Sequence, residues 1–230
     1  MTISFPGKSG KGPQRPEMFE NWAPRFPNTH GGIAAAVNAL VEGYKTFCTQ
    51  YQKTNTDETS TEGARLVRSA KAARAKLAPL IETLDAASAS AAEQVAQLRS
   101  KAAQSYNPPD PKYPTCMRHQ EIRAHFKSLP QKDRLGLLEA ARVDGDEDTL
   151  IAIASCQPYL SAVPQQMHQY VRDQLIEAHA PNEAATLKSI GEQRALAEQL
   201  RQTMLQSVGD LIDFRKADEL IAAASEELAA

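Results

Sequence analysis

Apolar residues recur at alternating steps of four and three through residues 63–104, and this spacing predicts one long amphipathic helix. At 1.5 Å per residue, that helix would be roughly 60 Å long, which is more than a compact domain of this size needs. The register continues across Pro79, so we expect this proline to kink the helix rather than end it. The pattern predicts an elongated protein whose long helices associate through one apolar seam. The larger side chains of this predicted oligomerisation seam are Leu66, Leu77, Leu84, Val95 and Leu98.

The same alternation predicts two further long helices. One runs from about residue 29 to residue 53, and the polar residues 54–61 that follow favour an antiparallel hairpin with the central helix. The other runs from Asn182 to the C-terminal end, with local weakening expected at Gly191 and Gly209. Its last part, residues 213–230, carries five acids and two bases and is expected to fray or to meet a basic surface. The pattern leaves open whether the long helices pair within one chain or between chains.

Four prolines in residues 106–116 predict a stiff, extended linker, and short helices follow it. These helices are expected at about residues 117–129, 130–143, 147–156 and 162–176, with Ser161 as the cap of the last. The predicted fold is therefore all-α. Its regions are an extended arm (1–30), a long helical hairpin (31–105), the linker (106–116), a small helical unit (117–180) and a long C-terminal helix (181–230).

Residues 1–28 contain eight glycines and prolines, which exclude regular helices and central strands. The segment nevertheless holds several aromatic residues, including the only tryptophan, whereas disordered tails are poor in aromatics. An extended arm with aromatic anchors is suited to filling surface pockets on a partner. Packing on the protein's own helices is the alternative, and we favour the partner. The predicted partner-binding residues are Phe5, Phe19, Trp22 and Phe26.

Five basic residues without an intervening acid lie on the first half of the central helix, and they form the candidate nucleic-acid contact. Aromatic stacking residues are not interleaved with them, so nucleic acid is the less favoured partner. The alternatives are a solvated face or contact with an acidic neighbour. The five residues are Arg65, Arg68, Lys71, Arg74 and Lys76.

Composition and charge add few constraints. The formal net charge is −2, which gives no global attraction to nucleic acid or acidic membranes, and no apolar run approaches the roughly 20 residues of a membrane span. Three cysteines and five histidines show no metal-ligand spacing, so neither metal nor cofactor is expected. The only polar cluster that we nominate for an enzyme is Glu121, His125 and His168, and we expect no enzymatic activity.

One segment carries a resemblance. Residues 121–163 read EIRAHFKSLPQKDRLGLLEAARVDGDEDTLIAIASCQPYLSAV, with a leucine-proline junction, a charged helix, a glycine-aspartate break and a proline-tyrosine stop. This order resembles all-helical proteins of unassigned activity from tailed phages and prophages. The resemblance implies a virion component, located in the virion or in the host cytoplasm during assembly.

The predicted function is therefore a non-enzymatic virion structural protein of the portal, tail or particle interior. It would form homo-oligomers through its long helices, contact other phage structural proteins through its arm, and not associate with membranes. The alternatives are a scaffolding protein or assembly chaperone, and a helical nucleic-acid-binding regulator.

Overall fold

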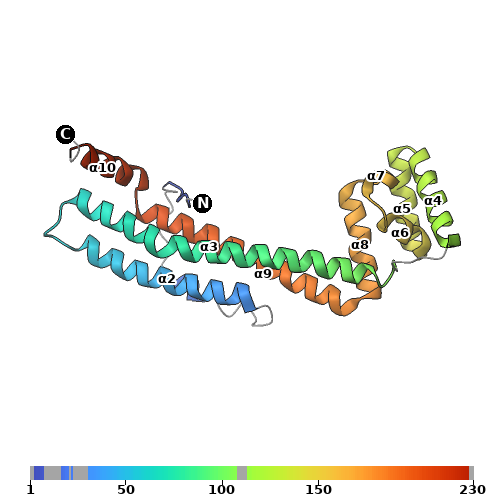
Figure 1. The fold of residues 1–230 in the computed structure, drawn as a ribbon, viewed down its shortest axis with the longest axis horizontal. Helices are drawn as coiled ribbons and strands as arrows, with labels where there is room; N and C mark the ends of the chain where they lie inside the picture. Colours follow the sequence, from blue (N-terminus) through green and yellow to red (C-terminus); the bar gives the residue numbers. More distant parts are fainter. Residues whose placement is uncertain (1–2, 8–16, 21, 23–30, 108–112, 228–230) are drawn as a thin grey trace. The chain divides into compact units, whose positions relative to one another are not determined.

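The computed structural model describes residues 3–7, 17–20, 22, 31–107 and 113–227, and within these residues every regular element is a helix (Figure 1). The predicted all-α fold is therefore confirmed. The helices are α1 (Glu17–Glu20), α2 (Gly31–Asn55), α3 (Glu62–Ala103), α4 (Tyr113–Ser128), α5 (Gln131–Asp144), α6 (Glu147–Ala154), α7 (Pro158–Ser161), α8 (Gln165–His179), α9 (Pro181–Leu211) and α10 (Phe214–Glu227).

The chain forms two compact units. Unit 1 consists of Met1–Ala92 and Ile190–Ala230, and unit 2 consists of Glu93–Ser189. Helices α3 and α9 each contribute to both units, so the boundaries fall inside helices rather than in the proline-rich linker. The two units are described separately below.

In unit 1, α2 and α3 form an antiparallel hairpin, as the hydrophobic pattern predicts (Figure 1). Gly32 near the start of α2 approaches Ala87 of α3, and Gly43 further along lies directly against Leu80. The hairpin loop is held by Asp57, whose carboxylate accepts hydrogen bonds from the Thr59 amide and hydroxyl and from the Ser60 hydroxyl. An aspartate that bonds the backbone two residues ahead is a standard turn-forming device.

Helix α9 completes unit 1 and packs against both helices of the hairpin. The Tyr51 hydroxyl of α2 donates to the Leu211 carbonyl at 3.0 Å, and Arg201 of α9 forms an ion pair with Asp85 of α3 at 2.7 Å. Apolar side chains from all three helices fill the space between them. The fully buried ones include Leu40, Tyr44 and Phe47 of α2, Leu77, Ile81 and Leu84 of α3, and Leu200, Met204 and Val208 of α9.

The expected single C-terminal helix is wrong, because the structure has two helices there. Helix α9 ends at Leu211, and Asp213 then caps α10 by accepting a hydrogen bond from the Lys216 amide at 3.0 Å. An aspartate side chain satisfies the unpaired amides of a helix start, and this favours a new helix over continuation. Gly209 does not interrupt α9. It instead allows the Pro6 carbonyl to approach so closely that a β-carbon at position 209 would collide with it.

Unit 2 is built from short helices around a second apolar core. Helix α6 is central and packs against α4, α5 and α8. The core side chains include Phe126 of α4, Leu138 of α5, Ile153 of α6 and Val171, Leu175 and Ile176 of α8. The order of short helices agrees with the sequence pattern, although α4 begins at Tyr113, four residues before the expected start.

Local signals mark several helix boundaries in unit 2. Gly145 stops α5 in the left-handed conformation with φ of 69°, and Asp146 caps α6 by accepting from the Thr149 amide. The expected cap at Ser161 is wrong: Ser161 lies inside α7, and Pro164 precedes the first residue of α8. Pro158 starts the extra helix α7, because proline is favoured in the first helical turn.

Candidate functional site

The aromatic anchor at the start of the arm packs on the protein's own chain. The Phe5 ring is stacked on Phe214 of α10, with ring centroids 4.5 Å apart and planes 9° apart. The guanidinium of Arg74 lies 5.3 Å from the centroid of the same Phe214 ring. The Gln206 amide of α9 also donates to the Gly7 carbonyl at 3.0 Å. The segment of residues 3–7 is therefore bound to the end of α9 and the start of α10.

The next aromatic anchor, Phe19, packs on α2. Phe19 of α1 is fully buried and contacts Tyr44 edge-on, with ring centroids 4.9 Å apart. Trp22 is half-buried, and its backbone amide donates to the Phe19 carbonyl. Phe26 lies outside the described residues. The rings of Phe5 and Phe19 thus lie on the chain's own helices. This placement agrees with the alternative hypothesis, in which the arm packs on its own chain instead of a partner.

The central part of the predicted oligomerisation seam is covered within one chain. Leu77 and Leu84 are 0% and 1% exposed, whereas Leu66, Val95 and Leu98 are half-buried. In unit 1 the covering elements are α2 and α9. The two most central side chains of the seam are therefore not accessible to a second copy of this fold.

Three of the five basic residues on α3 have structural partners. Arg65 donates to the Asn55 and Asp57 carbonyls and so closes the hairpin loop. Arg68 bonds Asp57 and Ser60 of the same loop. These contacts hold the C-terminal end of α2 against the beginning of α3.

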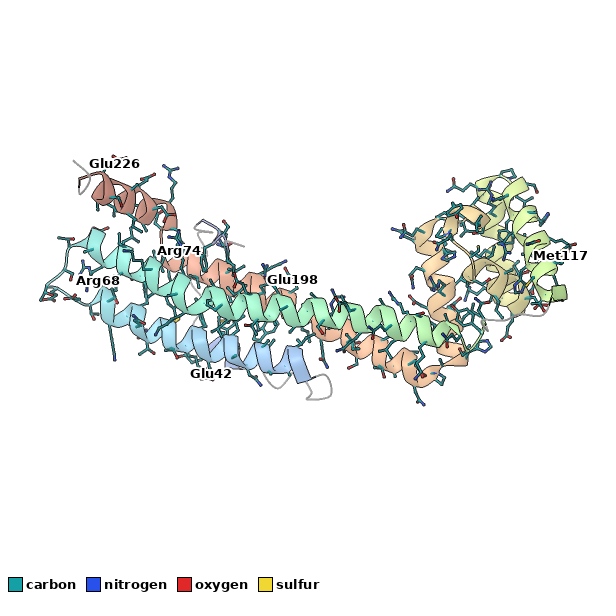
Figure 2. All side chains as sticks on the ribbon, in the orientation of Figure 1. Glu42, Arg68, Arg74, Met117, Glu198 and Glu226 are labelled. Atoms are coloured by element: carbon teal, nitrogen blue, oxygen red, sulfur yellow. The ribbon has the colours of Figure 1, made fainter. Side chains whose placement is uncertain are left out.

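The third, Arg74 of α3, is labelled in Figure 2. It forms a two-pronged ion pair with Asp218 of α10, at 2.7 and 2.8 Å. The pairing holds the pKa of Asp218 below its usual value, because a hydrogen-bonded guanidinium favours the ionised carboxylate. Lys71 and Lys76 are exposed and form no ion pair with a described residue. The acidic C-terminal part thus meets a basic surface of its own chain.

Unit 2 contains a cavity of about 630 Å³ whose polar lining residues the sequence pattern does not single out. The cavity is lined by Tyr106 after α3, by His119 and Arg123 of α4, by Cys156 after α6 and by Arg172 of α8. Cys116 of α4 lies at the same cavity. Because these residues come from four separate elements, no local spacing could have predicted that they meet.

Burial sets the protonation of the cavity residues. The pKa of His119 lies below its usual value, first because the ring is buried and second because Arg123 is nearby. Burial raises the pKa of the Cys156 thiol. His119 and Cys156 are therefore neutral near pH 7, and the charge at the cavity comes from the two guanidinium groups.

The three residues nominated for catalysis are not brought together. Glu121 and His125 are exposed on α4, whereas His168 is buried in α8 and its ring nitrogen lies 2.8 Å from the Cys156 carbonyl. Within the described residues, no group of three or more His, Cys, Asp or Glu side chains is arranged to hold a metal ion. In the same part of the chain, no helix is long and apolar enough to cross a membrane.

No known protein family, no curated protein and no solved structure matches the chain.

Proposed function

We propose that this protein is a non-enzymatic structural or assembly component of a tailed-phage particle and that it acts as a single folded chain. The phage context is supported by the resemblance of residues 121–163. The mode of action is supported by the geometry of unit 1. Such a component would reach the particle already folded, without needing a second copy to bury its helices.

The observation that carries this proposal is the burial of the long-helix seam inside one chain. Leu77 and Leu84 are covered by α2 and α9, and the ring of Phe19 packs edge-on against Tyr44 of α2. Long amphipathic helices are stabilised mainly by covering their apolar faces, and here the same chain provides the cover. A role as a folded spacer or adaptor therefore fits better than assembly through exposed coiled-coil seams.

The first test is the absolute mass of the purified protein by light scattering across a dilution series. One chain has a mass of 25.1 kDa, and we expect that mass at every concentration. A multimer of fixed size that persists on dilution would contradict the proposal that the protein acts as a single chain. It would indicate that the seam pairs between chains.

The second test concerns the phage context. Mature particles and precursor particles from a phage or prophage that carries this gene are purified, and peptides of the chain are quantified in both. A constant copy number in mature particles supports a resident virion component. Presence only in precursors supports the alternative of a scaffolding protein or assembly chaperone, and absence from both contradicts the phage proposal.

A further inference from the structure

The cavity of unit 2 has a size and position suited to a small ligand. Its volume of about 630 Å³ lies within the range that small-molecule sites occupy. The end of α3, helix α4, the connection after α6 and helix α8 all contribute to its walls. The lining combines Tyr106 and Leu160 with the polar amides of Gln120 and Gln157.

Two arginines line this cavity, and no carboxylate lines it among the described residues. Both side chains are half-buried. One N–H of Arg123 donates to the Ala152 carbonyl at 3.1 Å, which leaves the other guanidinium hydrogens available. Arg172 forms no hydrogen bond or ion pair with any residue that the structure describes.

Half-buried positive charge without a counter-charge is unfavourable. Removing a charge from water costs free energy unless an opposite charge or hydrogen bonds replace the lost hydration. Asp148 of α6 and Asp173 of α8 are the acids nearest in sequence to the cavity residues of these two helices. Asp148 is already paired with Arg118, and Asp173 is already paired with Arg99. The cavity thus presents two guanidinium groups whose counter-charge is not supplied by the described part of the chain.

Tyr106 also contributes to the wall of this cavity. The residue is 6% exposed, its ring lies 6.1 Å from that of His179, and its hydroxyl is enclosed without a hydrogen-bond partner among the described residues. The enclosed hydroxyl does not reach the cavity, so Tyr106 shapes the wall, and the two arginines provide the polar contacts for a ligand.

We propose that the cavity binds the phosphate group of a small molecule, with Arg123 and Arg172 facing the phosphate oxygens. A phosphate dianion matches the two positive charges, and the planar guanidinium fork suits phosphate oxygens. The glutamine amides and Leu160 would contact the remainder of a phosphate monoester. This inference does not depend on the proposed phage role.

Calorimetric titration of the full chain at constant ionic strength tests the proposal with three probes. Inorganic phosphate and adenosine 5′-monophosphate represent the free and the esterified phosphate, and a ten-residue oligothymidylate without terminal phosphate represents nucleic acid. We expect saturable binding of one or both small probes at one site per chain. If only inorganic phosphate saturates the site, the ligand is the free ion. If the nucleotide binds more tightly, the ligand is a phosphate monoester.

Arg172→Gln is the decisive variant, because it removes a charge that forms no hydrogen bond or ion pair with a described residue. We expect it to weaken binding of the small probes at least tenfold while leaving the melting temperature unchanged. Arg142→Gln is the matched control, since Arg142 is an exposed arginine of the same unit that bonds only Glu139. It should change the affinity by less than twofold.

Tyr106→Phe is a second control at the cavity wall. Because the hydroxyl is enclosed, removing it should leave the ligand-free protein at least as stable as before and change the affinity by less than twofold. Failure of both small probes to bind at millimolar concentration would overturn the proposal. Equal binding by the parent and Arg172→Gln would do the same, as would binding of the oligothymidylate alone that is lost on neutralising Lys71 and Lys76.

Discussion

Unit 1 and unit 2 are both helical, but different interactions hold them together. In unit 1, long helices bury continuous apolar faces, and the central side chains Tyr44, Leu77 and Leu84 are at most 1% exposed. In unit 2, short helices surround a smaller core, and arginine and histidine side chains bond the carbonyls at their ends. Arg134 alone donates to the carbonyls of Phe126, Lys127 and Ala162.

The difference follows from helix length. Every helix leaves four carbonyls unpaired at its C-terminal end, so a chain of short helices has proportionally more of them to satisfy. Arg123 donates a hydrogen bond to the Ala152 carbonyl of α6, and the ring of His168 is hydrogen-bonded to the Cys156 carbonyl just beyond that helix. Polar side chains inside unit 2 are thus part of its architecture, whereas unit 1 needs mainly apolar cover.

The largest effect is expected for a core truncation in unit 1. Leu77→Ala removes a fully buried side chain and should lower the free energy of unfolding by about 3 kcal/mol, because a cavity remains. Urea denaturation followed by circular dichroism measures the loss. Leu66→Ala, at the half-buried end of the same seam, is the control and should cost clearly less. Equal costs would mean that Leu77 is not covered within the chain.

The corresponding prediction for unit 2 concerns a polar residue. Arg134→Met keeps the aliphatic volume but leaves three carbonyls without their donor, and it should lower the free energy of unfolding by about 1–3 kcal/mol. Hydrogen exchange should accelerate at the end of α4 and around α7. Arg142→Met on the same helix removes only an exposed bond to Glu139 and should leave the free energy of unfolding close to that of the parent protein. A neutral Arg134→Met would refute the role of carbonyl bonding in unit 2.

One residue of unit 1 breaks the rule that apolar cover dominates there. Gln193 of α9 is 2% exposed, and both polar atoms of its amide lack hydrogen-bond partners within the part of the chain that the structure describes. Gln193→Met should therefore raise the free energy of unfolding by about 1–2 kcal/mol, since a buried unpaired amide is removed. Gln199→Met, at an exposed position of the same helix, should change it by less than about 0.5 kcal/mol. A destabilised Gln193→Met would show that the amide has a partner in solution.

Acidification should distinguish the units. Burial lowers the pKa of His168 below its usual 6.5, and the pKa of His119 is lowered for the same first reason. As the pH falls below 6.5, the unfolded chain takes up protons that the folded chain does not, so stability decreases. The described residues of unit 1 contain no histidine. Exchange protection should therefore fall in unit 2 first between pH 7 and 5.5, and His168→Gln should reduce that slope.

The smallest effect is expected at the surface of unit 1. Asp218→Asn weakens the exposed ion pair with Arg74 and should cost about 0.5–1 kcal/mol at low salt, and less at high salt. Thermal melts at two salt concentrations provide the measurement, with Glu219→Gln as the control on the same helix. A salt-independent loss would indicate that Arg74 acts mainly through its contact with Phe214.

The sequence pattern predicts the helices well where the apolar repeat is long. It places the central helix at residues 63–104, and α3 spans Glu62–Ala103 with Pro79 inside it. The prediction fails where a single side chain sets a helix boundary. Asp213 caps the start of α10, and the spacing of apolar residues carries no information about such a cap. The candidate ligand cavity was not predictable, because Tyr106, Arg123 and Arg172 are far apart in sequence.

The sequence by itself determined that the chain is all-helical, which faces are apolar and where the short helices of unit 2 begin to replace the long ones. Those properties depend on residues a few positions apart, and local spacing reports them directly. Only the tertiary structure decided that the chain covers its own seam, that Phe5 and Phe19 rest on its own helices and that two arginines share one cavity. An apolar helix face must be covered, but its periodicity does not identify the helix that covers it. The covering helix is determined by contacts between distant parts of the chain.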